Sequence, residues 1–177
     1  MQKKVKMINI NQDNYKSNNI FSIEEVLPIL KKLRNQGKKI GLCTGSFDLL
    51  HPGHITHLDS AKRMCDILVV GLAKDCFSKN KNLGSGRPIY SQELRAFMVS
   101  KLKSVDYVFF DDGKPEIIMT IKPDVYFKGK DYFDETNPNI IAQKKMMESL
   151  GGKMIFTQDE KLSTTDIIKH IKEDIQQ

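Results

Sequence analysis

Two histidines, His51 and His54, are the residues of this chain best placed to do chemistry. They belong to the stretch GSFDLLHPGH at positions 45–54, which directly follows a short apolar run. Pro52 suits the first position of a helix, so His51 is the expected N-cap and His54 lies one turn further on. The free amides and the positive dipole of a helix N-terminus favour an anion. Because Gly45 also lets the backbone approach a phosphate, the stretch predicts a phosphate-binding site.

Taken one at a time, these histidines also fit simpler roles. A histidine at the start of a helix is commonly a surface or capping residue. A metal site is a second alternative, but the third and fourth ligands that zinc needs are missing nearby in the sequence. The combination of strand, glycine and paired histidines favours function over both alternatives. His57 stands one turn beyond His54 without support from a motif, so it is left out of the predicted site.

Three further segments carry polar or basic residues next to predicted strands and helices. Ser163, Thr164 and Thr165 precede the last predicted helix, where they are ordinary caps that could also hold a triphosphate. The loop KNKNLGSGRP at 79–88 is basic and contains glycines, so it either closes over phosphates or is a solvated loop. The segment FKGKDY at 127–132 ends a predicted strand, and that position favours a functional role.

Apolar runs of strand length alternate with segments of helical periodicity. Strands are predicted at 39–44, 66–72, 105–110, 124–128 and 153–157. Helices are predicted at 22–37, 53–64, 91–102, 115–121, 138–150 and 164–175. Short apolar strands that alternate with helices are typical of a parallel sheet covered on both faces. With right-handed crossovers this is a doubly wound, Rossmann-like α/β fold, whose ligands bind at the C-terminal ends of the strands.

The chain of 177 residues is long enough for one domain with a substantial core and too short for two ordinary ones. Residues 1–20 are rich in Asn and Lys and predict a mobile N-terminal arm, in which residues 5–10 could form a short strand. Residues 21–177 are the predicted single domain. Its first helix opens with a capping box, in which Ser22 and Glu25 satisfy each other's backbone amides.

Charge and composition exclude several classes of protein. The net charge of +6 favours an anionic ligand, either nucleic acid or a phosphorylated small molecule. The lysines are spread along the chain without a long basic block, which argues against a nucleic-acid partner. No apolar run approaches the ~20 residues that cross a bilayer, and no apolar segment follows the N-terminal lysines. Neither a membrane partner nor a secretory signal is therefore expected.

The three cysteines, Cys43, Cys65 and Cys76, are odd in number and widely spaced. This pattern suggests neither a disulfide framework nor a zinc site, and it favours a reducing, cytoplasmic compartment. Each cysteine is expected to be a small core residue.

The two polar motifs together resemble the cytidylyltransferase-like nucleotidyltransferases, a superfamily marked by GxFDxxHxGH and a later Ser/Thr-rich motif. GSFDLLHPGH at 45–54 matches the first motif, and LSTTDII at 162–168 matches the second. Within the superfamily, GRPI at 86–89, SVDYV at 104–108 and KPDVYFKGKDY at 122–132 are most similar to the nucleotidyltransferase domain of heptose-phosphate enzymes, the ADP-heptose synthase type. Such enzymes join a nucleotide, usually AMP, to a sugar 1-phosphate.

The chain departs from the heptose pattern at three places. Lys130 replaces a glycine in KGKDY, the segment DETNPNII at 134–141 is longer than usual, and Leu83 stands where many relatives carry lysine. These departures bear on the sugar and the base rather than on the reaction class.

The resemblance implies roles for the residues that match its motifs. His51 and His54 would donate hydrogen bonds to phosphates in the transition state, and Lys81 and Arg95 are the further catalytic candidates. For Arg95 the alternative is a surface ion pair. Nucleotide contacts are expected from Thr44, Gly45, Ser46, Phe47, Asp48, Gly53, Arg87, Lys128, Gly129, Asp131, Leu162, Ser163, Thr164 and Thr165. Mg²⁺ that bridges the triphosphate is the expected cofactor, and no metal site of the protein itself is expected.

Three functions stay open on the sequence. The favoured one is transfer of a nucleoside monophosphate from a nucleoside triphosphate, ATP ahead of CTP, to a sugar 1-phosphate such as heptose 1-phosphate. The second is a cytidylyltransferase that uses CTP and glycerol 3-phosphate or another alcohol or sugar phosphate. The third is a non-catalytic nucleotide- or RNA-binding protein, although the presence of both motifs favours an enzyme. Because relatives are often homodimers, a homodimer is also expected.

Overall fold

The structure is a computed structural model that describes residues 14–81, 86–134, 136–160 and 162–173. The side chain of Lys81 lies outside the described part, so its catalytic role stays a prediction. Leu83 and the short strand expected at residues 5–10 also lie outside the described residues.

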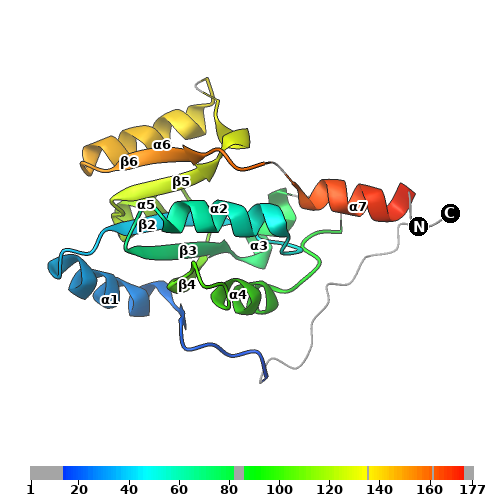
Figure 1. The fold of residues 1–177 in the computed structure, drawn as a ribbon, viewed down its shortest axis with the longest axis horizontal. Coiled ribbons are helices and arrows are strands. Elements are labelled where there is room, and N and C mark those ends of the chain that lie inside the picture. The colour runs from blue at the N-terminus through cyan, green and yellow to red at the C-terminus, as the bar shows by residue number, and fades with distance from the viewer. Residues whose placement is uncertain (1–13, 82–85, 135, 161, 174–177) are drawn as a thin grey trace.

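Six parallel strands form one sheet (Figure 1). They are β1 (Ile20–Phe21), β2 (Ile40–Gly45), β3 (Ile67–Ala73), β4 (Tyr107–Asp111), β5 (Val125–Gly129) and β6 (Lys153–Thr157). Their order across the sheet is β1-β4-β3-β2-β5-β6, and every neighbouring pair is parallel. The predicted doubly wound α/β fold is therefore confirmed. The order reverses between β2 and β5, which is the place where folds of this kind bind their ligands.

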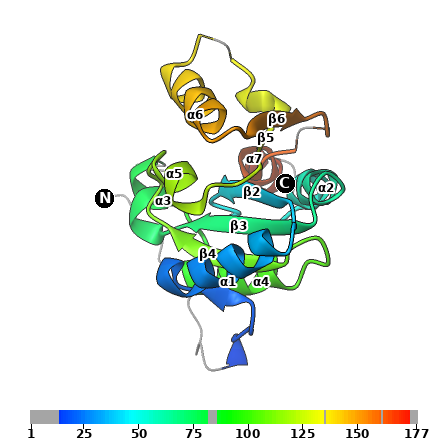
Figure 2. The same cartoon turned by 90° about the vertical axis from the view of Figure 1, so that its left-hand side faces the viewer.

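Helices cover both faces of the sheet (Figure 2). They are α1 (Ile23–Asn35), α2 (Pro52–Lys62), α3 (Asp75–Lys81), α4 (Gln92–Ser100), α5 (Ile117–Ile121), α6 (Pro138–Ser149) and α7 (Thr164–Glu173), with a 3₁₀ helix, η2, at Lys130–Tyr132. One apolar core includes Val26 of α1, Ile118 of α5 and Met147 of α6. The opposite core includes Leu58 of α2 and Val99 of α4. Each face of the sheet is thus closed by its own helices.

The alternation of side chains along each strand explains why the strands are apolar throughout. Leu42 belongs to the core under α1, α5 and α6, whereas its neighbour Cys43 belongs to the core under α2 and α4. Val69 and Val70 divide between the two cores in the same way. A strand buried on both faces has no polar side, so its sequence is a continuous apolar run.

The N-terminal edge of the sheet was only partly predicted. The capping box at the start of α1 is present, since the Glu25 amide donates to Ser22 Oγ at 3.2 Å and the Ser22 amide donates to Glu25 Oε2 at 2.7 Å. Strand β1 was not predicted because it has only two residues. Its Ile20 pairs with Val108 of β4, so the sheet includes the last residue of the predicted arm.

Two other differences concern the segment after β3. Helix α3 was not predicted because its sequence, DCFSKNK, lacks an apolar periodicity. Cys76 lies in this helix and is exposed, so the expectation of a core residue was wrong there. Cys43 is buried as expected, Cys65 is half-buried, and all three thiols are free.

Candidate active site

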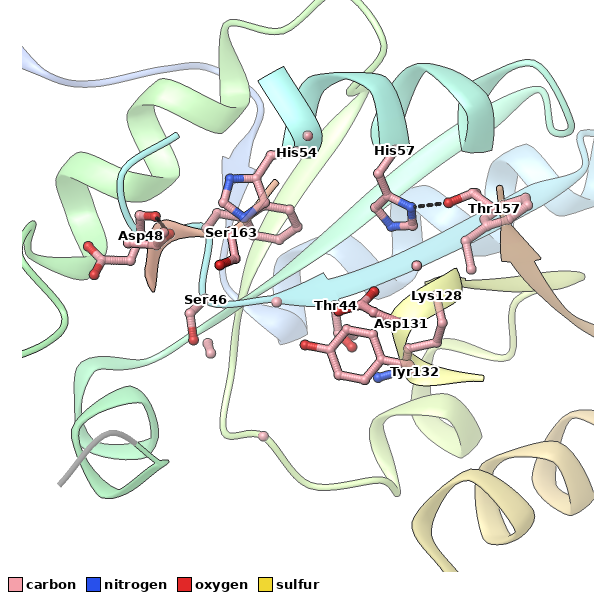
Figure 3. Close-up of a pocket in the computed structure, with 18 of the residues that line it drawn as sticks. Thr44, Ser46, Asp48, His54, His57, Lys128, Asp131, Tyr132, Thr157 and Ser163 are labelled. Carbon is pink, nitrogen blue, oxygen red and sulfur yellow. Dashed lines mark hydrogen bonds between the residues drawn. The ribbon is translucent and has the colours of Figure 1, made fainter. Parts of the chain in front are cut away.

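A pocket of about 760 Å³ opens at the C-terminal ends of β2 and β5, where the strand order reverses. Loops and helix starts from both halves of the sheet line it (Figure 3). The predicted site residues found in its lining are Thr44, Gly45, Ser46, Phe47, Asp48, His51, Gly53, His54, Arg87, Lys128, Gly129, Asp131, Leu162, Ser163, Thr164 and Thr165. Of the predicted residues whose side chains the structure describes, only Arg95 is not among these.

His51 and His54 stack on each other at the start of α2, with ring centroids 3.7 Å apart. His51 is the N-cap and Pro52 the first residue of the helix, as the sequence predicted. The His51 side chain makes no capping hydrogen bond, so its ring is available to a ligand in the pocket. Both Nδ1 atoms are buried and have no hydrogen-bond partner among the described residues. The pair therefore presents polar atoms that a ligand could satisfy.

Burial keeps both rings neutral. The pKa of His54 is lowered to about 3, first because burial disfavours the charged ring and then because His51, His57 and Arg87 are nearby. The pKa of His51 is also lowered, mainly by burial and then by the charge of Arg87. A neutral imidazole still has one N–H to donate. The site therefore offers hydrogen-bond donors to an anion without carrying fixed charge on its histidines.

The loop between β2 and α2 has an unusual backbone. Phe47 and Leu49 have φ values of +49° and +48°, in the left-handed region that residues with side chains rarely adopt. The Phe47 ring packs against His54, with centroids 5.3 Å apart. At Gly53, an added Cβ would lie 3.0 Å from the Leu162 carbonyl oxygen. The glycine between the two histidines thus lets the segment before α7 approach α2 closely.

Asp48 ties this loop to the rest of the pocket. It is 2% exposed, and its carboxylate accepts hydrogen bonds from Arg87 Nε at 3.2 Å and from the Ile89 amide at 2.9 Å. Its backbone carbonyl accepts a hydrogen bond from the hydroxyl of Thr164. The carboxylate thus positions Arg87, and the backbone positions α7.

The three hydroxyls at the start of α7 have different environments. Ser163 caps the helix, because its Oγ accepts from the Asp166 amide at 3.2 Å. Thr164 is buried and bonded to Asp48. Thr165 is exposed and accepts a hydrogen bond of 3.4 Å from Arg87 Nη1. A phosphate at this helix end would therefore meet the Thr165 hydroxyl, the Arg87 guanidinium and the free amides of α7.

Arg95 does not fit its predicted contact with substrate. It is fully buried, and its Nε donates to the Tyr90 carbonyl at 3.1 Å. Its Nη2 donates to the Ala73 carbonyl at 2.9 Å and to Asp75 Oδ1 at 2.7 Å, and its Nη1 donates to the Ser46 carbonyl. The guanidinium therefore links the segment after β2 to the end of β3 and the start of α3. The alternative of a surface ion pair is also wrong, because the side chain has no exposed surface.

Lys128, at the end of β5, has its Nζ over two aromatic rings. Its Nζ is 5.1 Å from the ring centroids of both Tyr126 and Tyr132. Burial lowers the pKa of Lys128. Tyr126 in turn bonds to the hydroxyl of Thr44 across the switch point, with 2.7 Å between the oxygens. An added Cβ at Gly129 would lie 2.6 Å from Asp131 Oδ1, so the glycine lets η2 fold back on the strand.

The structure adds pocket residues that the sequence did not single out. His57 points from α2 toward β2, as His54 does, and its Nδ1 lies 2.8 Å from Thr157 Oγ1 of β6 (Figure 3). Its pKa is lowered, chiefly by burial. Asp111 at the end of β4 and Gln143 of α6 also line the pocket. Asp111 and Thr157 could have been found from the sequence, because they stand at the ends of predicted strands. Nothing in the sequence distinguished Gln143 from other polar residues of its helix.

The described residues form neither a metal cluster nor a membrane span. Within the ranges that the structure covers, no group of three or more His, Cys, Asp or Glu side chains could hold a metal ion. No helix in the same ranges is long and apolar enough to span a membrane.

Comparisons with known sequences place the chain in a family. The family model described as "Cytidylyltransferase-like" matches residues 42–170. Over 166 residues the chain is 40% identical to "Bifunctional protein HldE" of Aliarcobacter butzleri, a match that covers 90% of this chain and 33% of that protein. A protein of the same name from Syntrophotalea carbinolica is 38% identical over 151 residues, which cover 84% of this chain and 30% of that protein. The chain thus spans about a third of the length of these relatives.

Solved structures agree with the fold. The "lipopolysaccharide core biosynthesis protein" of Thermoplasma volcanium matches with a TM-score of 0.59 and 27% identity over 71% of this chain and 100% of that chain. A pantoate-beta-alanine ligase from Francisella tularensis matches with a TM-score of 0.59 and 20% identity over 91% of this chain and 80% of that chain, which shows the fold alone. The family match confirms the resemblance seen in the sequence and contains every residue that lines the pocket, from Thr44 to Thr165. The chain therefore belongs to the cytidylyltransferase-like family of nucleotidyltransferases.

Proposed function

We propose that this chain transfers a nucleoside monophosphate from a nucleoside triphosphate, ATP ahead of CTP, to a sugar 1-phosphate such as heptose 1-phosphate. The observation that carries the proposal is the stacked, neutral pair His51 and His54, which faces the start of α7 across one pocket. This arrangement supplies donors to phosphates from two helix N-termini. The sequence similarity to heptose-type proteins supports the choice of sugar phosphate.

The reaction needs positioning and charge stabilisation rather than a base. An oxygen of the acceptor phosphate, largely ionised near neutral pH, attacks the α-phosphorus. The bond from that phosphorus to the oxygen that bridges it to the β-phosphate breaks, and pyrophosphate leaves with the electron pair. The N–H groups of His51 and His54 would donate to oxygens on the α-phosphorus as charge develops there. Arg87, Thr165 and the amides of α7 would hold the leaving pyrophosphate.

Mg²⁺ would arrive as part of the triphosphate substrate. The described residues hold no ready-made cluster of metal ligands, and the Asp48 carboxylate is already bonded to Arg87 and to backbone amides. This fits a magnesium ion bound mainly by phosphate oxygens and water, as is common for Mg²⁺ in phosphoryl transfer. The ion would neutralise charge on the triphosphate, while the protein binds and orients it.

The base would lie near residues 128–131 and Leu162, which line the same pocket. His57 and Thr157 form the neighbouring wall. A site fitted to adenine rejects cytosine through unpaired buried polar groups, and the converse also holds. The second candidate is therefore a cytidylyltransferase that uses CTP and glycerol 3-phosphate or another alcohol phosphate. It is favoured by Lys130, which replaces the glycine of the heptose pattern beside this site.

A binding protein without catalysis is the third candidate, and it is the least supported. A protein that only binds a nucleotide or RNA has no need of both motifs, yet the histidine pair and the start of α7 are both intact here. For the protein as a whole we propose a cytoplasmic location, which the three free thiols support. The homodimer expected from the sequence stays a prediction.

Pyrophosphate release tests the proposal. The purified chain is incubated with ATP or CTP, each with Mg²⁺, and a panel of acceptors that contains heptose 1-phosphate, other sugar 1-phosphates and glycerol 3-phosphate. We expect release with ATP and a sugar 1-phosphate. Release only with CTP and an alcohol phosphate would establish the second candidate, and no release with any pair would contradict enzymatic function.

A further inference from the structure

One part of the pocket faces away from α2 and is not used by the proposed phosphate contacts. Thr44 and Asp111 stand two residues beyond Leu42 and Phe109, which belong to the core under α1, α5 and α6. Because side chains alternate along a strand, Thr44 and Asp111 face α5 and α6 rather than α2. We call this part the α6 lobe and define it by Thr44, Asp111, Lys114, Tyr126, Asn139 and Gln143, all of which line the pocket.

Gln143 places an unsatisfied acceptor in the α6 lobe. It stands three residues after Ile140 and four before Met147, both of which are buried, so it lies on the inner face of α6. Its Oε1 is buried and has no hydrogen-bond partner among the described residues. A buried amide oxygen without a donor costs free energy, and a hydroxyl group of a ligand would remove that cost.

Asp111 adds a second buried acceptor to the same lobe. It is 5% exposed, and its Oδ1 accepts a hydrogen bond of 2.9 Å from the Gly113 amide. One such bond leaves a carboxylate with the capacity to accept several more. Lys114, on the same loop, also lines the lobe and brings a positive charge. The lobe thus combines hydroxyl acceptors with a cation, which suits a phosphate that carries hydroxyl groups.

The expected direction of attack favours binding of the acceptor substrate in this lobe. In a displacement at phosphorus the attacking and leaving oxygens lie roughly in line. The leaving pyrophosphate would lie by Ser163 and Thr165 at the start of α7. Figure 3 shows Ser163 and Thr44 on opposite sides of β2. The acceptor would therefore enter from the side of Thr44 and α6.

We propose that the α6 lobe binds the hydroxyl groups of a sugar phosphate acceptor, and that Gln143 and Asp111 are the specificity-determining residues that accept hydrogen bonds from them. This inference rests on the proposed function. A sugar ring holds several hydroxyls in fixed directions and can satisfy both acceptors at once. Glycerol 3-phosphate has fewer hydroxyls on a flexible chain, so it loses more conformational freedom for each hydrogen bond.

Steady-state kinetics of two conservative variants test the inference. Gln143→Leu keeps the size of the side chain but removes its amide, and Asp111→Asn keeps an acceptor for the Gly113 amide but removes the charge. The matched control is Lys145→Gln, an exposed position of α6 outside the pocket. We expect KM for the sugar 1-phosphate to rise about tenfold in each variant, with KM for ATP unchanged. The control should match the wild type in both.

Failure of the inference and failure of the proposed function give different results. If the wild type is active and both variants keep the wild-type KM for the sugar phosphate, the inference is wrong and the function stands. If KM for ATP rises instead, the lobe binds the nucleotide and the inference is also wrong. A wild type that releases no pyrophosphate with any acceptor contradicts both. Thermal melting checks folding, and if Gln143→Leu does not fold, Asp111→Asn alone decides.

Discussion

At the scale of single residues, the proposed mechanism depends on two imidazoles that would be neutral when they meet a highly charged substrate. Burial is the main reason, and the Arg87 guanidinium adds to it. The charge that balances the triphosphate would therefore come from Arg87, from Mg²⁺ and from helix dipoles, while the histidines contribute directed N–H groups. Hydrogen bonds from donors held in this way strengthen most when negative charge develops in the transition state.

The depressed pKa of His54 predicts how stability changes with pH. The unfolded chain takes up this proton near the ordinary value of 6.5, whereas the folded protein takes it up only near 3. Between these values the unfolded state binds more protons, so the free energy of unfolding falls as pH falls from about 6.5 toward 3. His54→Phe keeps a ring of similar size and removes the titration. We expect this variant to lose less stability than the wild type over that window.

Urea unfolding between pH 4 and pH 8 measures this difference. His51 and His57 titrate beside His54 in both proteins, so their contributions largely cancel in the comparison. Parallel curves for the two proteins would mean that His54 is not depressed, and the neutral-donor account would lose its basis.

At the scale of elements, the start of α7 is expected to combine a structural role and a ligand-binding role in adjacent residues. The Thr164 hydroxyl is buried against the Asp48 carbonyl, whereas the Thr165 hydroxyl lies by Arg87 at the surface of the pocket. Thr164→Val should leave a buried carbonyl without its donor and reduce the free energy of unfolding by about 1–3 kcal/mol. Thr165→Val should instead raise KM for the triphosphate severalfold and leave stability nearly unchanged.

Kinetics and denaturant unfolding of both variants separate the two roles. An unchanged KM in Thr165→Val, with a loss of stability alone, would show that the hydroxyls only cap the helix. Each variant serves as the control for the other, because the substitution is the same and the positions are adjacent.

At the scale of the whole molecule, the reversal of strand order between β2 and β5 gathers distant segments around one pocket. The sequence predicted this fold because strands buried on both faces are apolar runs, and helices between them have clear caps. The motif residues at the ends of these strands were predicted for the same reason, since parallel strands end at one edge.

The parts of the candidate site that were not predicted depend on contacts between residues that are distant in the sequence. Arg95 was predicted to touch substrate, but its guanidinium donates to carbonyls from three segments that are distant in the sequence, and only the folded chain brings these together. His57 and Thr157 are one hundred residues apart, so their hydrogen bond has no local signal. In the sequence Gln143 is an ordinary polar residue of a helix, and only the packing of α6 brings it to the pocket.

Ligand binding by the whole molecule gives a prediction about the base. A ligand at 100 times its dissociation constant adds about 2.7 kcal/mol to the free energy of unfolding. For a chain of this size that corresponds to a rise of roughly 5–10 °C in Tm. We expect ATP with Mg²⁺ to produce such a rise and CTP with Mg²⁺ to produce much less. A larger rise with CTP would assign the pocket to cytosine and leave the role of the histidines unchanged.

The central claim is that His51 and His54 stabilise the transferring phosphate, and the rate of pyrophosphate release by the double variant His51→Ala/His54→Ala tests it most directly. The matched control is His170→Ala, an exposed histidine of α7 outside the pocket. Loss of a donor to a developing charge costs about 3–4 kcal/mol, so we expect the rate to fall a few hundredfold or more while the protein stays folded. His170→Ala should keep the wild-type rate. A folded double variant that releases pyrophosphate at nearly the wild-type rate would contradict the account.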